Sequence, residues 1–149
     1  MNNDEKWMAL AIQEAFNAEA EGEVPIGAVL VKDGQLIAQA HNQPISTNDA
    51  TAHAEIQLLR TAGKKQKNYR LINTSIYVTL EPCAMCLAAM IHARIAQIVF
   101  GAYDSKTGVC GSCGDLSKAN FFKHKIKISG GFLENECKEL LQSFFKSRR

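Results

Sequence analysis

His53 and Glu55 lie two positions apart in the stretch "TAHAEIQLL" (residues 51–59), where a helix is predicted to begin. An imidazole can bind a metal ion, and a carboxylate can accept a proton. Residues two apart on the side of a helix point in different directions. From the N-terminal end of a helix, however, both side chains can reach one point beyond the axis. A simpler interpretation is a polar first turn, with Thr51 as N-cap and Glu55 near the positive end of the helix dipole.

Two cysteines in the stretch "LEPCAMCLAAM" (residues 80–90) are possible partners. Pro82 suits the first position of a helix, which places Cys83 and Cys86 in its opening turns and on one face. If the two helix N-termini face each other, these thiols and His53 can bind one zinc ion. Three ligands of this type leave the fourth tetrahedral position open for water, as in catalytic rather than structural zinc sites.

Glu55 distinguishes these two kinds of zinc site. A structural site needs no carboxylate beside it, whereas a hydrolytic site needs a base that takes a proton from the bound water. Alone, a C-x-x-C motif is often two buried thiols, and H-x-E occurs by chance in many chains. Together, at two helix starts, the motifs predict one catalytic zinc ion per chain.

The elements that must hold these residues follow from the hydrophobic pattern. Residues Met8, Ala11, Ile12, Ala15 and Phe16 recur at helical spacing, which predicts an amphipathic helix from about Asp4 to Glu21. After it we expect the strands "VPIGAVLV" and "QLIAQAHN" around an Asp33-Gly34 turn, a helix opening at Thr51, the strand "SIYVTL", a helix opening at Pro82, the strand "IAQIVFGA", and a helix from about Leu133 to Phe145. This alternation predicts an α/β fold with a mixed sheet between helical layers.

Length and composition limit the class of protein. A chain of 149 residues is the usual size of one domain, so we expect a single domain over residues 1–149. The N-terminus is acidic where a secretory signal would be positive, and no apolar run could span a membrane, which predicts a cytoplasmic protein. Its five cysteines are then thiols or metal ligands rather than disulfides. The net charge of +2 permits a nucleic-acid partner without requiring one.

The combined H-x-E and P-C-x-x-C motifs are the signature of the zinc nucleobase deaminases. Nearly the whole chain resembles the bacterial tRNA-specific adenosine deaminases, through the segments "EVPIGAVLV", "HNQPI", "AHAEI", "EPCAMCLAAMIHARI", "FGAYDSKTG" and the Phe-Phe pair before a basic tail. The last two features point to the tRNA enzymes within the superfamily. The resemblance implies a three-layer α/β/α, cytidine-deaminase-like fold, a homodimer, and conversion of the wobble adenosine of a tRNA anticodon to inosine.

The resemblance also implies a role for individual residues. The zinc ligands would be His53, Cys83 and Cys86, and Glu55 would shuttle protons while zinc activates a hydroxide. Asn42 would hydrogen-bond the target base, Ile26 would form an apolar wall of its pocket, and Asp104 would lie near the flanking nucleotide. Each of these three has a simpler interpretation, as the end of a strand, a core residue and a turn residue, respectively.

The segment "GVCGSCGDL" (residues 108–116) departs from the family pattern, because Cys110 and Cys113 form a second C-x-x-C. Its glycines predict a loop. A second zinc site would need two further ligands, for which Cys137 and His124 are available. The simpler interpretation is two reduced thiols, which oxidation could modify if the loop lies over the active site.

Three basic runs could contact the phosphates of a tRNA anticodon stem-loop: "GKKQKNYR" (63–70), "FKHKIK" (122–127) and the tail "FKSRR". Tyr69, Phe144 or Phe145 could stack on bases. Each run could equally be a solvated face, and the Phe pair could belong to the core.

Two other functions compete with tRNA deamination. A deaminase of a free nucleobase or nucleoside, of the guanine or cytosine type, would use the same zinc site and carboxylate but would not need the basic tail. A non-catalytic, zinc-stabilised RNA-binding module would explain the basic runs. It would leave Glu55 and the open zinc position without a purpose.

Overall fold

Helices and strands alternate along the chain, as the hydrophobic pattern predicts. The structure is a computed structural model that describes residues 3–148. In chain order the elements are α1 (Asn3–Ala20), β1 (Gly27–Lys32), β2 (Gln35–His41), α2 (Pro44–Thr47), α3 (Ala54–Gln66), β3 (Thr74–Leu80), α4 (Ala84–His92), β4 (Gln97–Ala102), the 3-10 helix η1 (Leu116–Lys118), β5 (Lys127–Ser129) and α5 (Glu134–Ser147). In this part of the chain, no helix has both the length and the hydropathy that crossing a membrane requires.

The five strands form one mixed sheet in the order β2-β1-β3-β4-β5. Strand β1 is antiparallel to both of its neighbours, whereas β3, β4 and β5 run parallel. The turn between β1 and β2 is formed by Asp33 and Gly34, which both have positive φ angles, of 51° and 72°. An Asp-Gly pair favours this tight hairpin turn, because glycine adopts positive φ without steric cost. The predicted mixed sheet and its hairpin are therefore confirmed.

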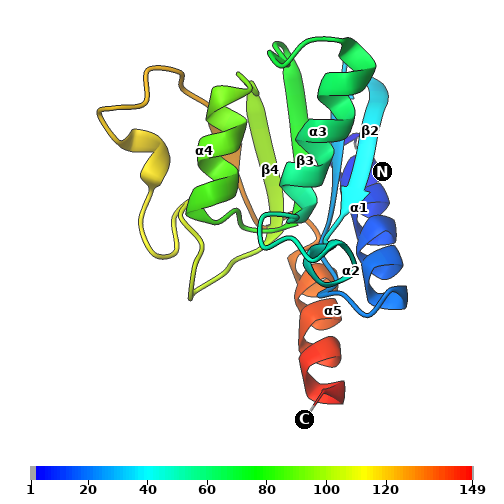
Figure 1. Ribbon diagram of the computed structural model, residues 1–149. Helices are drawn as coiled ribbons and strands as arrows, with labels where there is room; N and C mark the ends of the chain where they lie inside the picture. Colours follow the sequence, from blue (N-terminus) through cyan, green and yellow to red (C-terminus); the bar gives the residue numbers. More distant parts are fainter. Residues whose placement is uncertain (1–2, 149) are drawn as a thin grey trace.

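Both faces of the sheet are covered by helices (Figure 1). In β1, Ala28 and Leu30 belong to a core cluster with residues of α3 and α4, while Val29 and Val31 belong to a second cluster with residues of α1 and α5. A strand that is buried on both faces requires the continuous apolar run seen in the sequence. The predicted three-layer α/β/α fold is confirmed.

The predicted helix starts at Thr51 and Pro82 are wrong, because α3 begins at Ala54 and α4 at Ala84. Thr51 is held in the preceding turn, where its N–H and its hydroxyl both donate to the Asp49 carboxylate, at 2.8 and 2.7 Å. Phe16 was expected on the buried stripe of α1 but is 47% exposed. Three short elements, α2, η1 and β5, have no counterpart among the elements expected from the sequence.

The strand register brings four chain segments to one edge of the sheet. Three register pairs define this edge, namely Gly27 with His41, Ala28 with Val78, and Leu80 with Ala102. The start of β1 and the ends of β2, β3 and β4 therefore lie side by side. The adjoining residues Ile26, Asn42, Glu81 and Asp104 lie there as well. In α/β folds, ligands bind at the carboxyl ends of parallel strands, so this edge is where a site is expected.

Candidate metal centre and active site

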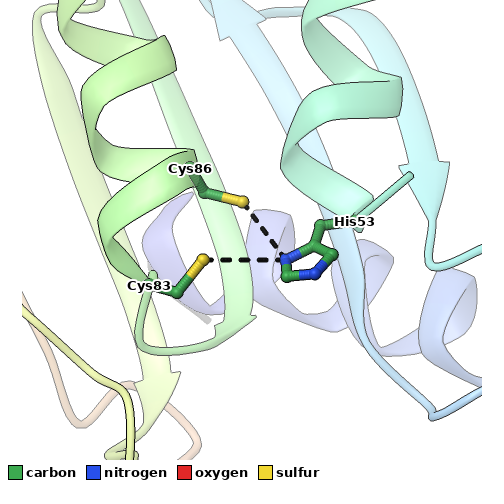
Figure 2. Close-up of side chains that lie close together, drawn as sticks. All are labelled: His53, Cys83 and Cys86. Atoms are coloured by element: carbon green, nitrogen blue, oxygen red, sulfur yellow. Dashed lines mark hydrogen bonds between the residues drawn. The ribbon is translucent and has the colours of Figure 1, made fainter. Parts of the chain in front are cut away.

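The predicted metal ligands come together at this edge, at the N-terminal ends of α3 and α4 (Figure 2). His53 is the N-cap residue of α3 and Cys83 the N-cap residue of α4, and Cys86 lies in the first turn of α4. Neither N-cap side chain caps its own helix. One ligand atom from each of the three side chains lies within 4.8 Å of the other two.

The distances between these atoms fit a zinc ion. His53 Nδ1 lies 3.7 Å from Cys83 Sγ and 3.5 Å from Cys86 Sγ, the two contacts drawn dashed in Figure 2. Ligands of a tetrahedral zinc at about 2.1 Å for nitrogen and 2.3 Å for sulfur lie about 3.6 Å apart. The three side chains can therefore hold zinc and leave a fourth position for water.

One of the two thiols, Cys83, already favours the charged form that zinc requires. A hydrogen bond from Cys86 lowers the pKa of Cys83 to about 4, with His53 adding to the effect and burial opposing it. The pKa of Cys86 is raised, because this thiol keeps the proton that the pair shares. A hydrogen bond with Cys83 in turn raises the pKa of His53. A thiolate at a helix N-terminus is also favoured by the helix dipole.

Glu55 is buried beside the ligands but is not one of them. It is the second residue of α3, and it lines a pocket of about 150 Å³ together with His53 and Cys83. Burial and, to a lesser extent, the charge of Cys83 raise the pKa of Glu55, while a backbone hydrogen bond and His53 oppose the rise, so that the resulting pKa is about 7. A carboxyl group that titrates near neutral pH can both accept and return a proton.

The structure brings the predicted substrate contacts Ile26, Asn42 and Asp104 to the wall of the same pocket. Asn42 does more than end a strand, since its Oδ1 accepts the Ala54 N–H at 2.8 Å and so caps α3. With Oδ1 held in this way, the Nδ2 amide is the group that Asn42 can offer to a ligand. The contacts of these three side chains with a substrate remain predictions.

Asp104 and Ile26 also keep their simpler roles. The Asp104 carboxylate closes a turn by accepting hydrogen bonds from the N–H of Lys106 and from the N–H and hydroxyl of Thr107. Burial by itself would raise the pKa of Asp104, but these hydrogen bonds together outweigh it and lower the pKa. Ile26 is partly buried and packs against the core between the sheet, α3 and α4. Both residues therefore combine a structural role with a place on the pocket wall.

Three further residues line the pocket and were missed by the sequence analysis, namely Leu80, Glu81 and Thr107. One feature of the sequence could have pointed to Glu81 as a residue of the site, namely its position directly before the Pro82-Cys83 pair. It did not show that the Glu81 side chain is buried, at 2% exposure.

The second cysteine pair does not join a metal site within residues 3–148. Cys110 packs against the core on the α3 and α4 face, whereas Cys137 is buried in the cluster on the opposite face of the sheet. The Nε2 atom of His124 lies 2.7 Å from the Ile95 carbonyl oxygen. Burial, with the charge of Glu81, raises the pKa of Cys110 to about 12, so this thiol is protonated at neutral pH. These observations favour the interpretation as two reduced thiols.

Two of the three basic runs lie away from the pocket. The run 63–70 comprises the last turn of α3 and the residues that follow it. This helix of 13 residues is about 20 Å long, and its other end holds His53. The run 122–127 leads into β5, where Lys127 pairs with Gln97 at the start of β4, the opposite edge of the sheet. Of the three runs, within residues 3–148, the tail is the one that reaches the surroundings of the pocket, through Lys146 near the end of α5.

A groove of about 700 Å³ adjoins the pocket and shares Leu80, Asp104 and Thr107 with it. Its other wall is α5, and its lining includes three lysines and two exposed aromatic residues, Lys106, Lys138, Lys146, Tyr103 and Phe145. The two phenylalanines of the Phe-Phe pair differ in their surroundings. Phe144 is buried, in agreement with the interpretation as a core residue, whereas Phe145 lines the groove. Arg148 lies over the Phe144 ring, 4.5 Å from its centre, and Arg149 lies outside the described residues.

Comparisons with known proteins agree with this site. The family model for the cytidine and deoxycytidylate deaminase zinc-binding region matches residues 1–102. The tRNA-specific adenosine deaminase of Buchnera aphidicola subsp. Schizaphis graminum is 47% identical over 156 aligned positions, which cover 99% of this chain and 97% of that protein.

Two solved structures are also similar. One comes from a biochemical and structural study of A-to-I editing by tRNA:A34 deaminases at the wobble position of transfer RNA. It has a TM-score of 0.89 and 43% identity, and the match covers 91% of this chain and 99% of that one. The guanine deaminase from Bacillus subtilis has a TM-score of 0.67 and 36% identity, over 75% of this chain and 71% of that one.

Proposed function

Because the chain belongs to the cytidine and deoxycytidylate deaminase family, we propose that it is a zinc-dependent enzyme that deaminates adenosine to inosine at the wobble position of a tRNA anticodon. We assign this activity to a single deaminase domain over residues 1–149. The observation that carries the proposal is the position of Glu55, a buried carboxylate beside a three-ligand zinc site. A non-catalytic RNA-binding module would have no use for that arrangement.

The residues of the pocket divide the chemistry among them. His53, Cys83 and Cys86 would hold the zinc ion, which would act as a Lewis acid and make a bound water easier to deprotonate. Glu55 accepts the proton of this water and delivers it to N1 of the adenine ring as C6 is attacked. Glu55 then takes the proton of the new C6 hydroxyl group and passes it to the amine, so that the C6–N bond breaks and ammonia and inosine result. The Asn42 Nδ2 donates a hydrogen bond to the base, and Ile26 packs against it.

An RNA substrate fits the surroundings of the pocket better than a free nucleoside does. The pocket is small enough to hold little more than a base, so the rest of a larger substrate must lie in the adjoining groove. The three lysines there can contact phosphates, and Tyr103 and Phe145 can stack on neighbouring bases. A base in an RNA loop is already partly unstacked, which lowers the cost of placing it in the pocket.

The direct test of this proposal is to incubate the purified protein with total tRNA and to measure inosine by nucleoside analysis. We expect inosine to appear, and to be abolished when a chelator removes zinc. Absence of inosine from every tRNA, with the zinc site loaded, would exclude the activity.

The salt dependence of RNA binding tests whether the groove is the surface that binds RNA. If Lys106, Lys138 and Lys146 each contact a phosphate, replacing all three by Ala should weaken binding of an anticodon stem-loop and reduce the slope of log affinity against log salt by about 2. The measurement is a binding titration at several salt concentrations. A matched control replaces Lys64, Lys65 and Lys67 by Ala. This variant loses the same number of positive charges, but at the far end of α3. An equal effect of the two triple variants would show that the groove is not the RNA-binding surface.

Two further parts of the proposal rest on the resemblance to the family alone. We propose that the chain acts as a homodimer and that it works in the cytoplasm, where tRNA is available. Sedimentation equilibrium of the zinc-loaded protein tests the first part, and a monomer at micromolar concentration would contradict it.

A further inference from the structure

Glu81 is a buried carboxylate that the proposed chemistry does not use. It lies between the end of β3 and Cys83, and its side chain is 2% exposed. A buried carboxylate must be compensated by a cation or by hydrogen bonds. Among residues 3–148, no Lys, Arg or His forms an ion pair with it. Its compensation comes instead from the segment of residues 103–113, which we call the rim loop.

Four hydrogen bonds from the rim loop converge on the Glu81 carboxylate. Oε1 accepts the Asp104 N–H at 3.0 Å and the Ser112 hydroxyl at 2.5 Å. Oε2 accepts the Cys110 N–H at 2.9 Å and the Ser112 N–H at 3.1 Å. Hydrogen bonds to an ionised acceptor are stronger than neutral ones, so this one side chain fixes both ends of the rim loop.

Gly108 shows how closely the rim loop is wrapped around the carboxylate. A Cβ atom at this position would lie 2.4 Å from Glu81 Cδ and 2.6 Å from Glu81 Oε1. Only a residue without a side chain therefore allows the contact. Next to it, the Val109 N–H donates to the Pro82 carbonyl at 3.1 Å, which ties the rim loop to the residue before Cys83.

The rim loop carries Asp104 and Thr107, which line both the catalytic pocket and the groove. We propose that Glu81 is a positioning residue, which fixes the Asp104–Thr107 turn against the pocket so that the wall that receives the substrate is preformed. This inference rests on the proposed function. Glu81 acts through the rim loop and not on the reacting atoms.

The variant Glu81→Gln has a specific expected consequence. The Ser112 hydroxyl can reverse and accept a hydrogen bond from the new amide nitrogen, so that nitrogen will occupy the Oε1 position. The Asp104 N–H then faces a donor and loses its partner, while the Cys110 and Ser112 N–H groups keep theirs. The Glu81 N–H still donates to the Ala102 carbonyl at 2.8 Å, so the end of β3 and Cys83 should stay in place.

The experiment measures deamination kinetics on an anticodon stem-loop together with amide hydrogen exchange. For Glu81→Gln we expect KM to rise about ten- to a hundredfold while kcat and zinc content change little. The Asp104 amide should exchange faster than in the wild type, and the Cys110 amide should not. Gly108→Ala, which leaves the carboxylate intact but forces the rim loop away, should reproduce the rise in KM, and Glu81→Asp should restore part of the affinity.

A control separates positioning from general stability. Tyr77→Phe removes the partly buried hydrogen bond to Asp4 on the opposite face of the sheet and should lower Tm without changing KM. A Glu81→Gln variant that loses Tm in the same way with an unchanged KM and unchanged Asp104 exchange would overturn the proposal. If the wild type does not deaminate RNA, the proposed function fails, whereas the exchange data still decide whether Glu81 holds Asp104.

Discussion

Replacing Glu55 by Gln is expected to lower kcat by about 10²- to 10⁴-fold, the range that general acid–base catalysis contributes. The amide has nearly the size of the carboxylate, so it should fill the same buried position at the start of α3. It cannot accept the proton of the activated water or return it to the base. Single-turnover kinetics on the anticodon stem-loop measure the loss, and zinc content and Tm should stay close to those of the wild type.

Asn42→Asp serves as a control for the same pocket. It keeps an oxygen that can accept the Ala54 N–H but removes the Nδ2 donor, so it should mainly raise KM. A Glu55→Gln enzyme with a near-normal rate would remove Glu55 from the mechanism. A variant that had lost its zinc would instead indicate that Glu55 supports the metal site.

Loss of zinc is the second large effect that we expect. Cys83→Ala removes one of three protein ligands and should reduce bound zinc from about one ion per chain to well below that and abolish activity. The substitution leaves His53 and Cys86 near each other without a third donor. Because the ion binds the folded chain only, its loss should also lower Tm.

The second cysteine pair supplies the matched variant. Cys110→Ala changes a half-buried thiol of the same C-x-x-C type, but one outside the ligand cluster. It should retain zinc and activity. Elemental analysis of the two purified variants compares them directly. Retention of zinc by the Cys83 variant and its loss from the Cys110 variant would show that the metal is held by the other pair.

The sequence was sufficient to predict the parts of the structure that depend on local spacing. The alternation of apolar runs predicted the order of the main helices and strands and the mixed sheet. The H-x-E and C-x-x-C motifs predicted which side chains meet at two helix N-termini. Their helix starts were misplaced by two or three residues, because His53 and Cys83 have the extended backbone of N-cap residues rather than helical geometry.

Contacts between distant segments could not be predicted in the same way. The carboxylate of Glu81 is buried only because the rim loop folds back over it, more than 20 residues later in the chain. The cap on Ala54 comes from Asn42, across the α2 segment. The lysine-lined groove exists because α5 packs beside the end of β4, which places Lys106 and Lys146 on one surface. The spacing of residues within one helix or strand does not predict such contacts between distant segments.

The identity of the substrate is the central claim, and relative kcat/KM values test it most directly. The zinc-loaded protein would be assayed under one set of conditions with an anticodon stem-loop that carries adenosine at the wobble position, with free adenosine, with cytidine and with guanine. We expect the stem-loop to be deaminated with a kcat/KM far above those of the other three, because only RNA can occupy both the pocket and the groove. Equal or faster deamination of guanine or of a free nucleoside would contradict the account.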